Sequence, residues 1–101
     1  MVNLIVSNIE KIRQLLAANK IEEAYVFGSA AKGNFNEKSD VDFLVRFSAD
    51  LTPLEKGELW WNLHDELRRF LNREIDIVTI NSLKNPYFIK EINDTKVLIY
   101  G

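Results

Sequence analysis

Two aspartates open an otherwise apolar segment in the middle of the chain, Asp40-Val41-Asp42-Phe43-Leu44-Val45. The apolar part is typical of a buried central strand, whereas the start carries two charges. Residues two apart on a strand project from the same face about 7 Å apart, so both carboxylates can reach one cation. Aspartate is unfavourable in strands and like charges repel each other. The segment therefore predicts a central strand whose first residues bind a cation or lie in water.

Local patterns predict helices and further strands around this segment. Ser7-Asn8-Ile9-Glu10 fits a capping box for a helix that ends near Ala18, where Asn19 suits a left-handed stop. Thr52-Pro53-Leu54-Glu55 is a second capping box, which opens the longest helix, to about Leu71. The other expected elements are strands at 24–27, 74–79 and 97–100, a turn-rich segment at 28–39, and a short helix from Asn85-Pro86 to about Ile92.

This order predicts one α/β (α+β) domain over residues 1–101, with a small mixed sheet of about four strands flanked by helices. The 13 basic and 15 acidic side chains give a net charge of −2, so a basic face for nucleic acid is not expected. The absence of cysteine excludes a disulfide framework, a thiolate zinc site and a cysteine nucleophile. Charges interrupt every apolar stretch before about 18 residues, so we expect no membrane segment and a cytoplasmic location.

Two further features fit a site at the start of the 40–46 strand. Asp76 lies between apolar residues in a second predicted strand, which can pair with the first. Gly28-Ser29 ends the preceding strand; the glycine allows close approach of the backbone to a ligand, and the serine offers a hydroxyl and amides to a phosphate. Oxygen ligands alone favour a hard cation such as Mg²⁺. Taken singly, each feature also fits solvated acids or an ordinary turn.

Together, Phe27-Gly28-Ser29, Asp40-Val41-Asp42 and Ile75-Asp76-Ile77 resemble the signature of the DNA polymerase beta nucleotidyltransferase superfamily. Over nearly the whole chain the sequence is similar to the minimal nucleotidyltransferases. The resemblance implies a polymerase beta-like fold and two divalent ions, Mg²⁺ or Mn²⁺, bound between the acids and a nucleoside triphosphate such as ATP. It also implies that a hydroxyl attacks the α-phosphorus and that pyrophosphate leaves.

Carried over position by position, the resemblance gives each site residue a role. Asp40 and Asp42 would bind both metals, and Asp76 would bind the catalytic metal and help to deprotonate the acceptor hydroxyl. The nucleotide phosphates would be held by Gly28, Ser29 and Lys32. Relatives often carry arginine in this turn, where the chain has two alanines and a lysine; lysine lacks the bidentate fork of arginine, so weak triphosphate binding is expected.

Members of this length are typically antitoxins paired with a helical HEPN-type ribonuclease toxin, and some transfer AMP from ATP to a toxin tyrosine. The resemblance therefore implies a protein adenylyltransferase with such a partner. One alternative is a catalytically silent antitoxin that acts by binding alone, and another is a transferase for a small hydroxylated molecule. A short chain also gains stability from covering apolar surface, so a homo-oligomer is a further option. Trp61 is a candidate interface anchor, unless another segment covers it.

Overall fold

A four-stranded mixed sheet, in the order β3-β2-β1-β4, forms the centre of the computed structural model, which describes residues 2–32 and 39–101. The strands are β1 (Ile21–Phe27), β2 (Val41–Phe47), β3 (Ile75–Thr79) and β4 (Val97–Tyr100). β1 runs antiparallel to β2 and β4, whereas β2 runs parallel to β3. The predicted mixed sheet flanked by helices is confirmed.

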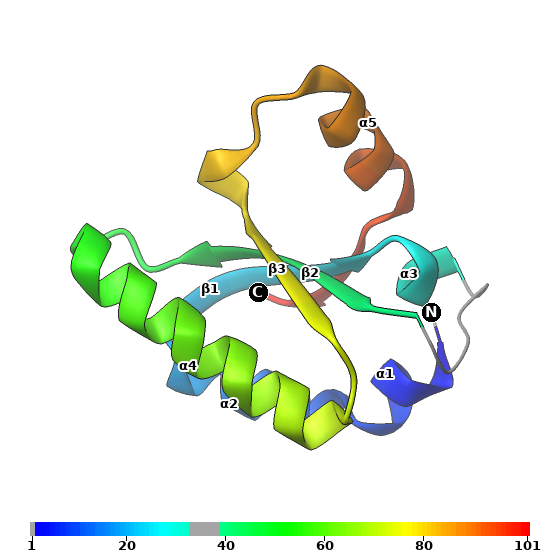
Figure 1. The fold of residues 1–101 in the computed structure, drawn as a ribbon, viewed down its shortest axis with the longest axis horizontal. Helices are drawn as coiled ribbons and strands as arrows, with labels where there is room; N and C mark the ends of the chain where they lie inside the picture. Colours follow the sequence, from blue (N-terminus) through cyan, green and yellow to red (C-terminus); the bar gives the residue numbers. More distant parts are fainter. Residues whose placement is uncertain (1, 33–38) are drawn as a thin grey trace.

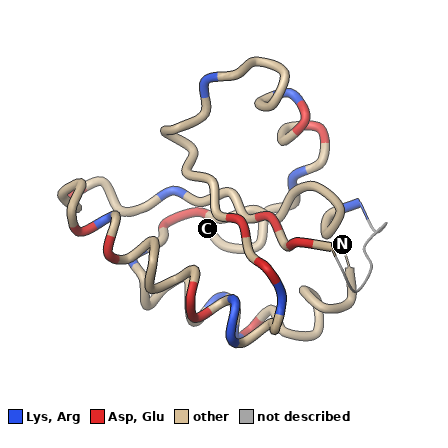
Figure 2. The backbone as a smooth tube through the Cα atoms, in the orientation of Figure 1, with Lys and Arg blue, Asp and Glu red and all other residues tan. Residues whose placement is uncertain are grey.

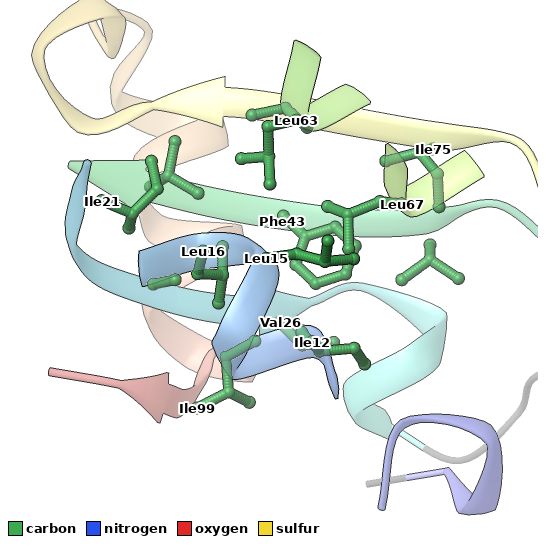
Figure 3. Packing of buried hydrophobic residues seen from close by; sticks show 14 of the residues in the cluster. Ile12, Leu15, Leu16, Ile21, Val26, Phe43, Leu63, Leu67, Ile75 and Ile99 are labelled. Carbon is green, nitrogen blue, oxygen red and sulfur yellow. The ribbon is translucent and has the colours of Figure 1, made fainter. Parts of the chain in front are cut away.

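Helices α2 (Ile9–Ala18) and α4 (Pro53–Leu71) cover one face of this sheet, following the short helix α1 (Asn3–Ser7) (Figure 1). Figure 3 shows apolar side chains of both helices, such as Leu15 and Leu67, beside Phe43 of β2. Alternate residues of a strand point to one face, so Val41, Phe43 and Val45 share this core. The side chains of Asp42 and Leu44 point to the opposite face of the sheet.

Helix α5 (Pro86–Thr95) lies on that opposite face, and a short 3₁₀ helix η1 (Ile80–Ser82) connects β3 to it (Figure 1). Phe27, Leu44 and Ile92 form a smaller buried cluster there. The ring of Phe88 meets Phe27 edge-on, with 6.1 Å between the ring centroids. Because Leu44 and Asp42 are two apart on β2, α5 and the candidate acids lie on the same side of the sheet.

The capping box of α4 is confirmed. The Thr52 hydroxyl accepts the Glu55 N–H at 3.2 Å, and the Glu55 carboxylate accepts the Thr52 N–H at 2.9 Å. Pro53 occupies the first helical position, where its missing N–H costs nothing. The helix ends at Asn72, which adopts the left-handed conformation with φ 54°.

The predicted end of α2 near Ala18 is confirmed, but both predictions about its capping residues are wrong. Ser7 belongs to α1 and donates its hydroxyl to Asn3, so no side chain caps the start of α2. At the other end Lys20, not Asn19, is left-handed, with φ 63°. The buried Asn19 side chain instead donates to the Leu15 carbonyl and to Glu66. The bond to Leu15 of α2 and the bond to Glu66 of α4 hold Asn19 in a different conformation, so its local preference is overridden.

Other boundaries shift by a few residues: β1 begins at Ile21 rather than at 24, and α5 continues to Thr95 rather than ending near 92. The segment predicted as turn-rich contains a short helix, α3 (Ser29–Lys32), and the prediction for 33–38 lies outside the described residues. No helix in the described part of the chain combines the length and apolar character needed to cross a membrane.

Candidate functional site

The predicted acids meet at one end of the paired strands β2 and β3. Asp42 lies opposite Asp76 in the parallel register and opposite Phe27 in the antiparallel one. These pairings place Phe27 at the end of β1, Asp42 of β2 and Asp76 of β3 side by side in one row across three strands, which we call the acid row. Asp40 immediately precedes β2, two residues before Asp42. Figure 2 shows red, acidic positions of β2 and β3 close to one another, in agreement with this register. The predicted adjacency of the two acid-bearing strands is confirmed.

Asp42 has the most perturbed carboxyl group in this row. Burial raises its pKa from 3.8 to about 6, with further contributions from the negative charges of Asp76, Asp40 and Glu91. An acid in this environment binds a proton or a cation more readily than an acid in water. Perturbation of this kind is typical of functional sites. Glu91 is an exposed residue of α5 that the sequence did not single out.

Gly28 follows β1 directly and packs against the Asp42 carboxylate. Its φ is +70°, a conformation that other residues rarely adopt. A Cβ at this position would lie 2.6 Å from Asp42 Oδ2, well inside van der Waals contact. Glycine is therefore required both by the turn and by the close approach of the backbone to the acid. The predicted approach of the Gly28 backbone to a ligand stays a prediction; the close contact in the structure is with the Asp42 carboxylate.

The backbone of Gly28 is held on both sides. Its N–H donates to Thr95 Oγ1 at 3.3 Å, and the Thr95 hydroxyl donates in turn to the Glu91 carbonyl at 3.1 Å. The Gly28 carbonyl accepts the N–H groups of Ala31 and Lys32, both at 3.1 Å, and so begins α3. The last residue of α5 thus ties that helix to the candidate phosphate-binding turn. The structure places the half-buried Ser29 and the exposed Lys32 at the two ends of α3.

The donor set fits divalent ions that share their coordination with a nucleotide. Within residues 2–32 and 39–101, no three acidic or histidine side chains are grouped closely enough to hold a metal ion by themselves. Mg²⁺ usually binds through one or two carboxylates together with substrate phosphates, so a complete protein cage is not required. The raised pKa of Asp42, beside two further aspartates, indicates an uncompensated negative site that a cation would relieve.

Sequence comparison identifies the protein family to which this arrangement of acids belongs. The family model "Polymerase beta, Nucleotidyltransferase" matches residues 10–101. The chain belongs to this family. Among curated relatives, MntA of Thermococcus cleftensis, a protein adenylyltransferase, is 34% identical over 85 residues that cover 76% of this chain and 82% of MntA. MJ1379 of Methanocaldococcus jannaschii, assigned as a protein adenylyltransferase, is 31% identical over 80 residues, 79% of this chain and 78% of that protein.

Among solved structures, the nucleotidyltransferase is similar to a chain from a crystal structure of a toxin–antitoxin with AMP-PNP. The match has a TM-score of 0.73 and 26% identity, and it covers 93% of this chain and 73% of the other. The family's nucleotidyl-transfer chemistry and the arrangement of the acid row therefore point to the same class of protein, a nucleotidyltransferase of the protein adenylyltransferase type.

Two residues near the row were missed from the sequence, Glu91 and Thr95. Both lie on α5, whose position over the acid-bearing face is set by packing of its apolar residues. The sequence contained no local sign of their proximity, because an acid and a threonine on an amphipathic helix are ordinary surface residues. Trp61 on α4 is 63% exposed, so no described segment covers it, and its role as an interface anchor stays a prediction.

Proposed function

We propose that this nucleotidyltransferase is an antitoxin that transfers AMP from ATP to a tyrosine hydroxyl of a cognate HEPN-type ribonuclease toxin. The proposal rests on the row formed by Gly28, Asp42 and Asp76, with Asp40 two residues from its centre. The names of the relatives, protein adenylyltransferases, support AMP as the transferred group. ATP as the substrate makes the cytoplasm the expected compartment.

The three aspartates are the proposed ligands of two Mg²⁺ ions, which Mn²⁺ can replace. Asp40 and Asp42 would hold both ions, and Asp76 would hold the catalytic one. When bound, Mg²⁺ lowers the pKa of the acceptor hydroxyl and stabilises negative charge on the leaving pyrophosphate. Burial of Asp42 among other acids favours this role, because a carboxylate that water solvates poorly gains more from a cation.

In the proposed reaction, the acceptor oxygen forms a bond to the α-phosphorus while the bond from that phosphorus to the β-phosphate oxygen breaks. Pyrophosphate leaves, and the hydroxyl proton passes to a carboxylate oxygen of Asp76. The products are the AMP-modified acceptor and pyrophosphate. Asp76 suits this role because its side chain is exposed, so an acceptor on another molecule can reach it.

The turn after β1 is the proposed site for the nucleotide phosphates. Ser29 would contribute its hydroxyl and its backbone N–H, and Lys32 would contribute a point charge. Gly28 acts in a different way, because its N–H is already bonded to Thr95. Its contribution is to bring the phosphate-binding turn into contact with Asp42, so that phosphates and acids share the same ions.

Incubation with ATP, Mg²⁺ and the co-expressed toxin, followed by intact mass analysis of both proteins, tests the proposal. We expect an AMP-sized mass increase on the toxin that Asp40→Asn and Asp42→Asn both abolish. The matched control is Asp94→Asn, which changes an exposed acid paired with Lys90 on α5 and should leave the transfer intact. Tight binding without any mass increase would instead establish a silent antitoxin, and AMP on a small molecule would contradict both.

A further inference from the structure

A polar pocket lies beside the acid row, and apart from Asp40 its lining residues have no role in the reaction described above. It has a volume of about 480 Å³ and lies where α4 ends and β3 begins, against the residues that precede β2. Three arginines line it, Arg68, Arg69 and Arg73, together with the carboxylates of Asp40 and Glu74. Its charged lining therefore has three positive and two negative groups, a net charge of +1 in a protein whose overall charge is −2.

The left-handed residue Asn72 brings these arginines together by turning the chain sharply between α4 and β3. Arg68 pairs with Glu74 at 2.9 Å, which ties the helix end to the start of the strand. Arg73 donates to the Ser39 carbonyl at 3.5 Å. Arg69 donates its Nε to the Asp65 carbonyl at 3.3 Å and forms no ion pair with any residue in the described part of the chain.

The position of the pocket relative to the acids indicates which reactant it faces. The sheet order is β3-β2-β1, and the candidate phosphate-binding turn follows β1. The pocket lies instead at the beginnings of β2 and β3, and it includes Asp40 itself. The phosphate-binding turn therefore lies at the β1 end of the row that contains Asp42 and Asp76, whereas the arginine pocket lies at its β2 and β3 end, along the same edge of the sheet. A nucleotide whose phosphates occupy the turn leaves the pocket open to the acceptor.

We propose that this arginine pocket binds an acidic side chain of the acceptor protein, close to the hydroxyl that receives AMP. The inference rests on the proposed function for the identity of the reaction, and it adds a recognition rule for the substrate: the acceptor hydroxyl is flanked by a carboxylate. Guanidinium groups bind carboxylates through paired hydrogen bonds, and such charge-assisted bonds are both strong and directional. Anchoring the acceptor in this way would orient its hydroxyl toward the acids.

A carboxylate fits the pocket better than a nucleic acid backbone does. Binding a phosphate backbone requires several cations along a groove. Here one excess positive charge lies in a single pocket, and the exposed acids Asp65 and Glu74 border the arginines. These acids would repel a polyanion, whereas one acidic side chain needs only one or two arginines.

Calorimetric titration of the metal-free and nucleotide-free protein with short tyrosine peptides tests the proposal. One peptide carries glutamates beside the tyrosine, and the other carries glutamines. We expect the acidic peptide to bind about five- to tenfold more tightly, a difference of about 1–1.4 kcal/mol, because a charge-assisted hydrogen bond forms in a partly exposed pocket. Arg69→Gln should abolish this preference and Arg69→Lys should retain part of it. The control Arg46→Gln, which changes a partly exposed, ion-paired arginine at the far end of β2, should keep this preference in full.

Equal affinity for the two peptides would overturn the proposal, as would a preference that survives in Arg69→Gln. So would tighter, Arg69-dependent binding of a 3′-phosphorylated dinucleotide, which would assign the pocket to a nucleic acid acceptor. A thermal shift of the unsubstituted protein with Mg²⁺ and ATP is recorded on the same samples. Absence of that shift counts against the proposed function, while the peptide titration, done without nucleotide, still decides the role of the pocket.

Discussion

Replacing Asp42 by asparagine should stabilise the metal-free protein at neutral pH. The carboxyl pKa is about 6 in the folded protein, against 3.8 for the ordinary group, because of burial and then of the charges of Asp76, Asp40 and Glu91. When the folded pKa of an acid lies above the unfolded one, the unfolded state ionises more readily. The destabilisation is therefore absent at a pH below about 4 and fully present once the pH exceeds about 6.

The size of this effect follows from the shift in pKa. Two pKa units correspond to about 3 kcal/mol if the full shift acts on unfolding. Asp42 is only half-buried, so solvent screening reduces the expected gain to about 1 kcal/mol. For a domain of this size that gain corresponds to an increase in Tm of about 4–8 °C. Asparagine keeps the shape of the side chain, so Gly28 and its turn need not move.

Thermal unfolding followed by circular dichroism in EDTA, at about pH 3 and about pH 7.5, measures the difference. We expect Asp42→Asn to raise Tm at the higher pH and to leave it unchanged at the lower one. With Mg²⁺ and ATP, only the unsubstituted protein should gain stability. The control is Asp50→Asn: hydrogen bonding to Ser48 lowers the pKa of Asp50, so its loss should not stabilise the protein at either pH. A Tm of Asp42→Asn equal to or below that of the parent at about pH 7.5 would refute the electrostatic argument.

Three further substitutions test the contacts around the site and the main helix. Gly28→Ala should lower the free energy of unfolding, measured by urea titration, by about 1–2 kcal/mol or more, because φ is +70° and the new Cβ would meet Asp42. The control Gly57→Ala places its methyl group in open space on α4. It should raise the free energy of unfolding by about 0.5–1 kcal/mol. An unchanged stability of Gly28→Ala would mean that the turn relaxes freely. Thr95→Val should raise the KM for ATP more than it lowers kcat, and Thr95→Ser should restore the KM, because serine keeps the hydroxyl that accepts the Gly28 N–H. An equal rise in KM for both variants would exclude a role for this hydrogen bond. Thr52→Ala should lower the free energy of unfolding by about 1 kcal/mol, measured in the same urea titration, and no loss would show that the capping box of α4 is dispensable.

Features decided by local patterns were predictable. The capping box at Thr52 and the apolar run of β2 specify their elements through nearby hydrogen bonds and side-chain hydrophobicity. The acid row was predictable for a related reason. Aspartate is unfavourable in an apolar strand, so its presence there indicates a site that binds a cation. Local preference failed at Ser7, which bonds to Asn3 within α1, and at Asn19, which bonds to Leu15 of α2 and to Glu66 of α4.

The sequence by itself therefore determined the strands, the main helix and the identity of the acids and the glycine turn. The tertiary structure alone decided which other groups reach them. Thr95 contacts Gly28 from 67 residues away, and the charge of Glu91 reaches Asp42 from another element of the fold. Arg69 and Arg73 share a pocket with Asp40 because of the turn at Asn72. These proximities depend on how helices pack across a sheet, a result of long-range burial that short-range sequence patterns do not encode.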